Sequence, residues 1–550
     1  MNFKENETLT KLRGGYYTPA PIASFLAKWV LLKKPKHILE PSCGDGSFIR
    51  AINGESPRKL QFIGVELLEE EANKARYEAS LNKHIDADIV NCDFLQWGLE
   101  RLGEEKTFDA VVGNPPYIRY QYLNENDQKL SEQLFKRYNL SFTKHTNAWV
   151  PFVIASVDLL KPGGRLAMVI PSELLHVLHA MSLRKFLLDW CSRILMIDPN
   201  ELLFEDALQG TVLLMVERKT NQTKPSQGVA VVAAPNNDFL STDPEEIFES
   251  AKYVSGDVLN GKWMKVLLDK EELEVFERIR KFPSIKKFSD IAKVDVGIVT
   301  GANKFFLVDN ATVSKYQLQD YAKPMFGRSG HCPGIIYSKE VHHGNAEKGM
   351  PTNFITIGKV EFNDLPVLAQ KYILEGEKES LHTRYKCRIR SPWYSVPSVY
   401  ATSLGMLKRA HNYPRLILNS AGAYTTDTAY RITSLTNPER LVYCFINSLT
   451  ALTAEMEGRH YGGGVLEMVP SEIEKLLVPV VDVADMDLVD LDLKISEQHD
   501  PDALFISQDR KVLVAAGLSE DDCRIIHQAW IHIRSRRQRL LGVKDAVIEE

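Results

Sequence analysis

The sequence predicts an α/β fold for the first part of the chain, a doubly wound sheet of mostly parallel strands, and a mixed α+β region after it. From residue 18 to about residue 218, apolar runs of strand length alternate with stretches of helical period. Such alternation is typical of parallel βαβ units with helices on both faces of the sheet. From residue 286 to about residue 480, short strands, glycine turns and aromatic clusters follow without this alternation. The two parts are therefore expected to fold differently.

The elements of the first part follow one another at short intervals. Thr18 is expected to cap a first helix that has Pro19 in its first turn. The apolar residues of this helix recur with helical spacing, at Ile22, Phe25, Leu26, Trp29 and Val30. Strands are predicted at 37–40, 61–66, 108–112, 165–170 and 210–216, a long apolar helix at 149–160, and a last helix at 520–541.

Composition indicates a protein of several domains with reduced thiols. The 550 residues are too many for one core, since single cores stop growing at roughly 250 to 300 residues. No run approaches the ~20 apolar residues of a membrane span, and the start of the chain lacks the apolar core of a signal peptide. A cytoplasmic protein without membrane contact is therefore expected. The seven cysteines form no CxxC pair, so neither a disulfide framework nor a metal site is indicated.

The first candidate site is "ILEPSCGDGSF", residues 38–48, where a strand ends and a glycine loop opens a helix. Gly44 and Gly46 let the backbone turn tightly and approach a ligand. Glu66, at the end of the next strand, can accept both hydroxyls of a ribose. Asp93 and Phe94 follow another apolar run and offer a carboxylate and an aromatic face for a purine. Because neither GxxxxGK[ST] nor GxGxxG is present, a nucleoside without a phosphate chain is the expected ligand.

The second candidate site is "FDAVVGNPPYIRY", residues 108–120. A buried strand leaves through Asn114, Pro115 and Pro116 into Tyr117. Two consecutive prolines have no backbone N–H and a fixed φ, so this turn is stiff and poor in donors. An ordinary turn is the competing interpretation, since Asn-Pro is a common turn starter.

Seven motifs, in their order along the chain, resemble those of the amino-group DNA methyltransferases. They are "GGYYTP" (14–19), "ILEPSCGDGSF", "GVE" (64–66), "CDF" (92–94), "GNPPY" (113–117), "LLKPGG" (159–164) and "VIPSELL" (169–175). With the cofactor motifs first, the order is similar to that of the gamma group of adenine-N6 enzymes, of which the TaqI methylase is the type. The resemblance covers residues 14–218 well. Further on, "VGIVTGANKFF" (296–306) and "RHYGGGVLEMVPSEIEKLLVP" (459–479) resemble that family's target-recognition domain.

The resemblance implies that the glycine-loop site holds S-adenosylmethionine. Thr18, Glu40 and the backbone of 42–46 would hold the methionine end, Glu66 the ribose, Asp93 the adenine amino group and Phe94 the adenine face. The complete set that it implies for this cofactor is Tyr17, Thr18, Glu40, Ser42, Cys43, Gly44, Gly46, Glu66, Leu67, Asp93 and Phe94.

For the loop of Asn114, Pro115, Pro116 and Tyr117 the resemblance implies catalysis. The Asn114 side-chain oxygen and the Pro115 carbonyl would accept both hydrogens of an exocyclic amine and localise its lone pair toward the methyl group, for in-line displacement without a covalent enzyme intermediate. Tyr117 would stack on a base rotated out of the duplex. Asn147 lies where the family has an asparagine near that base, and helix N-capping explains it almost as well.

One departure from the family concerns the aromatic residue that covers the other face of the base. It would fall near 210–219, where this chain has none. Phe204 is a neighbouring candidate, and the position stays unassigned.

The domains expected are a catalytic domain at 1–235, a connecting segment at 236–285, a target-recognition domain at 286–480 and a helical extension at 481–550. Although the net charge of −5 does not indicate a nucleic-acid binder, residues 384–415 carry seven Lys or Arg and no Asp or Glu, interleaved with aromatic residues. The predicted DNA contacts in this stretch are Arg384, Lys386, Arg388, Arg390, Trp393 and Tyr394.

Several alternatives stay open. An N4-cytosine methyltransferase uses the same amine chemistry, although its loop more often begins with serine. A glutamine-N5 protein methyltransferase also uses NPPY, but it normally needs no such C-terminal half. A non-catalytic specificity subunit with a methylase-like fold is the alternative from another class. The expected partner is double-stranded DNA; a cognate restriction endonuclease is an open second partner without a stable complex, and a monomer is expected.

Overall fold

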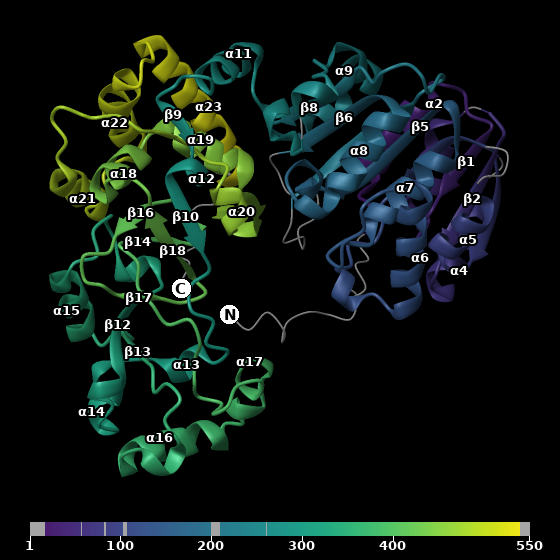
Figure 1. The fold of residues 1–550 in the computed structure, drawn as a ribbon. Coiled ribbons are helices and arrows are strands. Elements are labelled where there is room, and N and C mark those ends of the chain that lie inside the picture. Colours follow the sequence, from purple (N-terminus) through teal and green to yellow (C-terminus); the bar gives the residue numbers. More distant parts are fainter. Residues whose placement is uncertain are drawn as a thin grey trace. The chain divides into compact units, whose positions relative to one another are not determined.

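The computed structural model describes residues 17–56, 58–81, 84–102, 107–199, 210–259 and 261–538. Figure 1 gives the order and labels of their helices and strands. The described residues up to Leu267 form one compact unit, and Leu268–Gln538 form a second. In this part of the chain no helix is both long and apolar enough to cross a membrane.

The first unit is built on an eight-stranded sheet with the order β3-β2-β1-β4-β5-β7-β6-β8. Neighbouring strands are parallel except at β7, which is antiparallel to both β5 and β6. The predicted doubly wound α/β sheet is therefore confirmed. The strands are β1 His37–Glu40, β2 Leu60–Glu66, β3 Ile85–Asn91, β4 Phe108–Gly113, β5 Leu160–Pro171, β6 Cys191–Pro199, β7 Thr211–Arg218 and β8 Gly228–Ala234.

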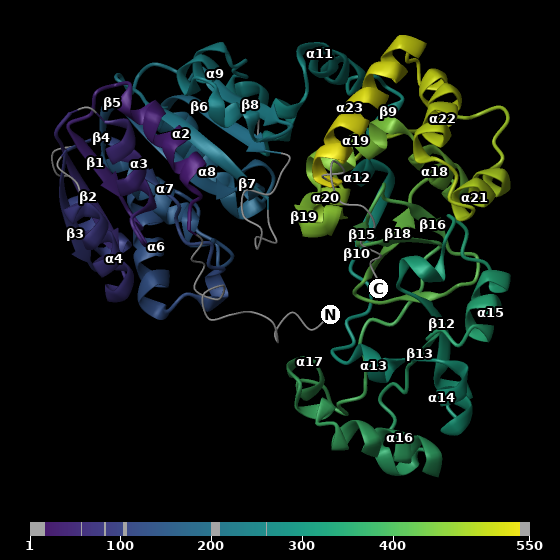
Figure 2. The ribbon, with the colours of Figure 1, turned by 180° about the vertical axis from the view of Figure 1, so that it is seen from behind.

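Helices cover both faces of this sheet (Figure 2). One core joins the sheet to α2, α3, α4 and α9, while α5, α6, α7 and α8 pack against one another. Every residue of α7 is buried, as expected for a helix that is apolar all round. The helices are α2 Ala20–Leu31, α3 Ser47–Glu55, α4 Glu69–Ser80, α5 Phe94–Arg101, α6 Glu125–Arg137, α7 Trp149–Leu159, α8 Met181–Trp190, α9 Pro244–Ser250 and α10 Gly256–Leu259.

Two details differ from the expectations. Thr18 does not cap the first helix, because α2 begins at Ala20 and Pro19 occupies the cap position without a side-chain hydrogen bond. The strands β3, β6 and β8 were not predicted. In β3 the aspartates Asp86 and Asp88 interrupt the apolar run, and this strand lies at the edge of the sheet, where one side can face water.

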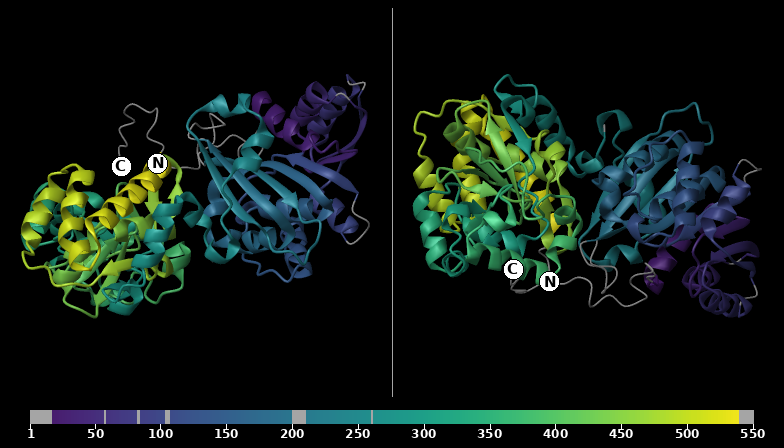
Figure 3. Two further views of the ribbon diagram at one scale, coloured as in Figure 1. Left: turned by 90° about the horizontal axis from the view of Figure 1, so that it is seen from above. Right: turned by 60° about the horizontal axis from the view of Figure 1, so that its bottom comes forward.

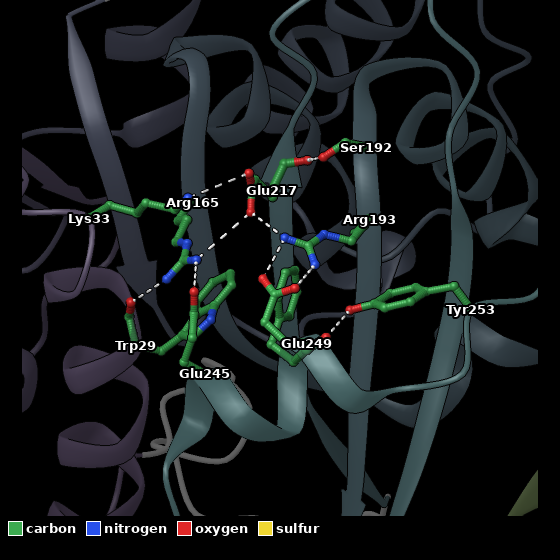
Figure 4. Close-up of polar contacts among 10 residues, drawn as sticks. Trp29, Lys33, Arg165, Ser192, Arg193, Glu217, Glu245, Glu249 and Tyr253 are labelled. Atoms are coloured by element: carbon green, nitrogen blue, oxygen red, sulfur yellow. Dashed lines mark hydrogen bonds and ion pairs between the residues drawn. The ribbon is translucent and has the colours of Figure 1, made fainter.

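A partly buried ionic network ties α9 to the sheet (Figure 4). Arg165 of β5 is fully buried; it donates to the Trp29 carbonyl at 2.9 Å and to the Glu245 carboxylate at 2.7 Å. Arg193 of β6 binds Glu249 at 2.7 Å. Part of the expected connecting segment 236–285 thus packs within the first unit, and the division between the units falls after Leu267. The sequence pattern gave no sign of this, because the ion pairs join residues far apart in the chain.

The second unit is a mixed α+β structure, as predicted. It contains two four-stranded sheets, β10-β18-β14-β16 and β11-β13-β12-β17, with a three-stranded sheet β15-β20-β19 and a two-stranded sheet β21-β9. The strands are β9 Ile285–Lys287, β10 Ala292–Asp295, β11 Leu307–Val308, β12 Ala322–Phe326, β13 Asn353–Ile355, β14 Leu404–Leu407, β15 Arg409–Ala410, β16 Leu416–Leu418, β17 Tyr424–Thr425, β18 Ala429–Ser434, β19 Arg459–Tyr461, β20 Val465–Glu467 and β21 Leu477–Pro479.

The last helices of the chain belong to the second unit. Figure 3 shows them in yellow, packed against one another. Within α23, Arg537 forms two buried hydrogen bonds, of 2.8 and 2.7 Å, with the Glu455 carboxylate. The helices of this unit are α11 Lys270–Ile279, α12 Phe288–Ile291, α13 Asn303–Phe306, α14 Asn310–Lys315, α15 Lys339–Glu347, α16 Val367–Lys378, α17 Tyr385–Arg388, α18 Pro438–Phe445, α19 Ser448–Glu457, α20 Pro470–Ile473, α21 Leu488–Ser496, α22 Pro501–Ala515 and α23 Glu520–Gln538.

The network around Arg165 gives a prediction for stability. Arg165→Ala should destabilise the first unit by about 3 kcal/mol, because it leaves Glu217 and Glu245 without their buried partner. Thermal unfolding of the full chain should show a fall in Tm of roughly 6 to 12 °C. Lys74→Ala, which breaks the exposed pair with Glu71, should change Tm much less. Equal Tm values for Arg165→Ala and the wild type would contradict a stabilising role for the network.

Candidate functional site

The candidate site lies at the edge of the first sheet where five parallel strands end. Strands β3, β2, β1, β4 and β5 are neighbours and run in the same direction, so their C-terminal ends meet at this edge. The loops that follow them carry the predicted cofactor and catalytic residues. Ligands of doubly wound folds bind at this edge of the sheet.

The glycine loop between β1 and α3 needs its glycines. Gly44 and Gly46 have φ angles of 48° and 87°, in the left-handed region that favours glycine. A Cβ on Gly46 would lie 3.3 Å from the Ala75 Cα. Under the loop, the buried Cys43 donates its backbone N–H to the Val65 carbonyl at 3.0 Å, and burial raises the pKa of its thiol. Cys43 therefore supports the loop by packing and does not serve as a nucleophile.

Three acidic side chains line this loop. Glu40 is 2% exposed, and burial, with the charges of Asp45 and Glu66 adding to it, raises the pKa of its carboxyl well above the ordinary value. Its Oε2 atom has no hydrogen-bond partner among the described residues. An orphaned buried carboxylate oxygen beside two further acids is a place where a cationic group would be stabilised. S-adenosylmethionine fits, since its α-ammonium group and its sulfonium both carry a positive charge.

The Glu66 carboxylate is oriented by the backbone. Its Oε2 accepts the Gly44 N–H at 3.0 Å and its Oε1 accepts the Leu68 N–H at 2.9 Å. Each oxygen keeps a second lone pair, so the carboxylate can still accept hydroxyl groups of a ligand. Leu67, next in the chain, is 62% exposed and offers an apolar surface beside it.

The other predicted cofactor residues occupy different environments. Asp93 caps α5 by accepting the Gln96 N–H at 2.8 Å through Oδ1. Phe94 is 2% exposed and packs on Phe152, with ring centroids 5.0 Å apart, so most of its surface already serves the core. Thr18 is buried, whereas the preceding Tyr17 is exposed.

The loop after β4 is held at several points. The Ser42 hydroxyl donates to the Asn114 main-chain carbonyl at 3.0 Å, which joins the glycine loop to the Asn-Pro-Pro-Tyr loop. The Tyr117 hydroxyl donates to the Val169 carbonyl at 3.0 Å and so fixes the ring to the end of β5. Pro115 is buried, and Asn114 and Pro116 are half-buried. The loop is thus rigid and anchored on both sides.

Asn147 has a partner that the sequence did not reveal. Its Nδ2 donates to the Glu173 carboxylate at 3.1 Å, and its side chain does not cap α7. Burial raises the pKa of Glu173, while the Arg119 charge and the bond from Asn147 oppose this rise. The next residue, Ala148, donates its N–H to the Ile118 carbonyl, just after the Asn-Pro-Pro-Tyr loop, at 2.9 Å. An acid in "VIPSELL", following a strand at the same edge, was the available signal for Glu173.

The predicted DNA-contacting residues of the second unit divide into two groups. Arg384, Lys386 and Arg388 are exposed on or beside α17. Tyr394 is 2% exposed and Trp393 is half-buried in the same hydrophobic cluster, so these two rings serve the core, which corrects their expected place on the surface. Arg390 is also structural, as its bonds to the carbonyls of 299 and 300 show. Phe204, the neighbouring candidate for the second face of the base, lies outside the described residues.

Two family models match most of the chain between them. Residues 27–204 match the family model described as Eco57I restriction-modification methylase. Residues 260–513 match that of the Type II methyltransferase M.Eco57I, C-terminal domain. The Type II methyltransferase M.AccI of Acinetobacter calcoaceticus is 23% identical over 475 residues, 84% of each chain. The Type II methyltransferase M.XamI of Xanthomonas campestris pv. amaranthicola is 24% identical over 490 residues, 85% of each chain.

Among solved structures, the Type IIL restriction-modification enzyme MmeI in complex with DNA is similar in fold, with a TM-score of 0.53 at 10% identity. The similarity covers 94% of this chain and 71% of that one. The first unit therefore has a methyltransferase-like α/β fold. With a matching methylase segment, a matching C-terminal domain and relatives of similar extent, the chain is a homologue of the Type II restriction-modification methyltransferases of the Eco57I kind.

Proposed function

We propose that this protein transfers the methyl group of S-adenosylmethionine to the N6 amino group of an adenine rotated out of double-stranded DNA. The observation that carries the proposal is the anchored loop from Asn114 to Tyr117, bound through Ser42 to a glycine loop lined by acids. The relatives M.AccI and M.XamI are Type II methyltransferases, which supports the reaction class.

The acidic loop would hold the cofactor. When bound, S-adenosylmethionine supplies an electrophilic methyl group on a sulfonium centre. Glu40 would bind the α-ammonium group of the amino acid end, and Glu66, already oriented by two backbone N–H groups, would accept hydrogen bonds from the ribose hydroxyls. The second carboxylate oxygen of Asp93 would accept a hydrogen bond from the amino group of the cofactor's adenine, with Leu67 against that adenine ring.

The catalytic loop would activate the amine by hydrogen bonding alone. An amino group conjugated to a purine is a poor nucleophile, because its lone pair is delocalised into the ring. The Asn114 Oδ1 atom and the Pro115 carbonyl would accept its two hydrogens in a non-planar arrangement and so localise that lone pair. The prolines bring no competing donor and fix the direction of the carbonyl. Acceptors that are already in place cost no reorganisation during the reaction.

Two side chains would hold the base at this loop. The Tyr117 ring, fixed through its hydroxyl, would stack on the base. Asn147 commits its amide N–H to Glu173, which fixes the orientation of the amide and leaves its carbonyl oxygen as an acceptor. Glu173 would then be a positioning residue for Asn147.

DNA binding would involve the second unit, whose exposed cations Arg384, Lys386 and Arg388 can neutralise phosphates. An N4-cytosine product requires the same loop chemistry and is the main alternative. A protein substrate would leave the exposed cations of the second unit without a polyanion to bind, and a non-catalytic role would leave the anchored loop without a function.

The reaction is tested by following the labelled methyl group. Wild-type protein incubated with methyl-labelled S-adenosylmethionine and DNA should yield N6-methyladenine after digestion to nucleosides. Asn114→Ala should lower the rate by at least about a hundredfold, since one of two amine acceptors is lost, while calorimetry should show nearly unchanged cofactor affinity. Label recovered as N4-methylcytosine, or only in protein, would overturn the adenine assignment. Full activity of Asn114→Ala would overturn the role of the loop.

The buried Glu40 gives a second prediction, in which stability and binding move in opposite directions. Its pKa is raised in the folded, unliganded protein, so the folded state binds the proton more tightly than the unfolded state does. Ionisation therefore lowers stability progressively as pH rises above the ordinary carboxyl pKa. Glu40→Gln should raise the Tm of the unliganded protein at neutral pH, and the gain should vanish in acid.

The same Glu40→Gln variant should bind S-adenosylmethionine about tenfold or more weakly, since a charge-assisted hydrogen bond worth ~1.5 to 3 kcal/mol is lost. Asp88→Asn, at an exposed position on β3, is the matched control and should change neither quantity. Wild-type cofactor affinity in Glu40→Gln would show that this carboxylate does not bind the α-ammonium group of the cofactor.

A further inference from the structure

A short ridge in the second unit exposes large apolar side chains among cations. It consists of residues 384–390, which include α17, and of the loop 296–301; we call it the α17 ridge. Tyr385 is 63% exposed and Ile389 is 61% exposed, while Val296 and Val299 of the loop are 45% and 38% exposed. The sequence of both segments contains no carboxylate.

The two segments of the α17 ridge are locked together. Arg390 donates from Nη2 to the Val299 carbonyl and from Nη1 to the Thr300 carbonyl, both at 2.7 Å. Gly301 has a φ of 81°, and a Cβ there would lie 2.7 Å from the Lys386 Cβ, so only glycine allows this approach. The exposed side chains therefore stand on a rigid base, and their exposure is not that of a loose loop.

The cations of the α17 ridge differ from the others of the basic tract. Lys408 and Arg409 bind the Glu467 carboxylate at 3.2 and 2.8 Å, and Arg415 donates to the Gly334 carbonyl at 2.9 Å. Arg384, Lys386 and Arg388 have no carboxylate partner in the part of the chain that the structure describes. Three positive charges are thus available for a polyanion.

We infer that the α17 ridge enters a groove of the DNA duplex and reads bases there, with Tyr385 and Ile389 against base edges and Arg384, Lys386 and Arg388 on the flanking phosphates. The inference rests on the proposed function, and it assigns sequence specificity to two residues. Charge complementarity selects DNA as the occupant. Phosphates offer no apolar surface to a tyrosine ring or an isoleucine, whereas the thymine methyl groups at the base edges do. Apolar surface that is rigidly exposed between cations therefore faces bases.

The experiment separates base reading from phosphate binding and does not depend on methyl transfer. Duplexes selected from a random library by binding to each variant reveal sequence preference, and binding across a salt series gives the number of phosphate contacts. Tyr385→Ala with Ile389→Ala should relax or change the selected sequence and leave the salt dependence as in the wild type. Arg384→Gln with Arg388→Gln should keep the sequence and reduce the slope of log K against log[salt] by about 1.8.

Val367→Ala, which removes a 79% exposed apolar side chain from α16, is the matched control and should change neither measurement. All exchanged residues are exposed, and equal Tm values should confirm that the variants fold. An unchanged selected sequence in the Tyr385/Ile389 variant would overturn base reading by the α17 ridge. An unchanged salt slope in the Arg384/Arg388 variant would overturn its place on the phosphates and favour a protein partner. A wild type that selects a sequence but transfers no methyl group would refute the proposed reaction alone.

Discussion

The hydrogen bond from the Ser42 hydroxyl to the Asn114 carbonyl is the contact on which the proposed site depends, because it joins the glycine loop to the Asn-Pro-Pro-Tyr loop. In-line transfer requires the reacting atoms to be about 3 to 3.5 Å apart and aligned, and a misplacement of ~1 Å is costly. The parallel pairing of β1 with β4 brings the two loops together. Ser42 and the anchor of Tyr117 on Val169 then remove the remaining freedom. The chain thus sets the geometry before any ligand arrives.

The packing around these loops buries two acids at the edge of the sheet. Glu40 and Glu173 both have raised pKa values because they are buried. Glu173 already accepts a hydrogen bond from the Asn147 amide, whereas ionisation of Glu40 weakens the fold until a cationic ligand binds there. Stability has to come from other parts of the first unit, and the fully buried α7 and the ionic network around Arg165 supply it.

Sequence reasoning predicted the parts of this fold that local pattern controls. The apolar runs of β1, β2, β4, β5 and β7 and the motifs at their ends could be read directly. The edge strand β3 could not, since its aspartates interrupt the apolar run. Long-range contacts were equally hidden: Tyr385 and Tyr394 look alike in the sequence, but in the folded chain Tyr394 is buried and donates to the Val360 carbonyl, whereas Tyr385 stays exposed. The pairing of Asn147 with Glu173 depends in the same way on two segments that meet only in the folded chain.

The central claim is that a rigid loop directs two acceptors at one exocyclic amine. A crystal structure of the protein with a duplex containing its target base and an unreactive cofactor analogue tests it most directly. The account predicts an adenine outside the helix, with its amino nitrogen about 3 Å from both the Asn114 Oδ1 atom and the Pro115 carbonyl oxygen. A target base that stays stacked in the duplex, or an amine that meets only one of these oxygens, would contradict it.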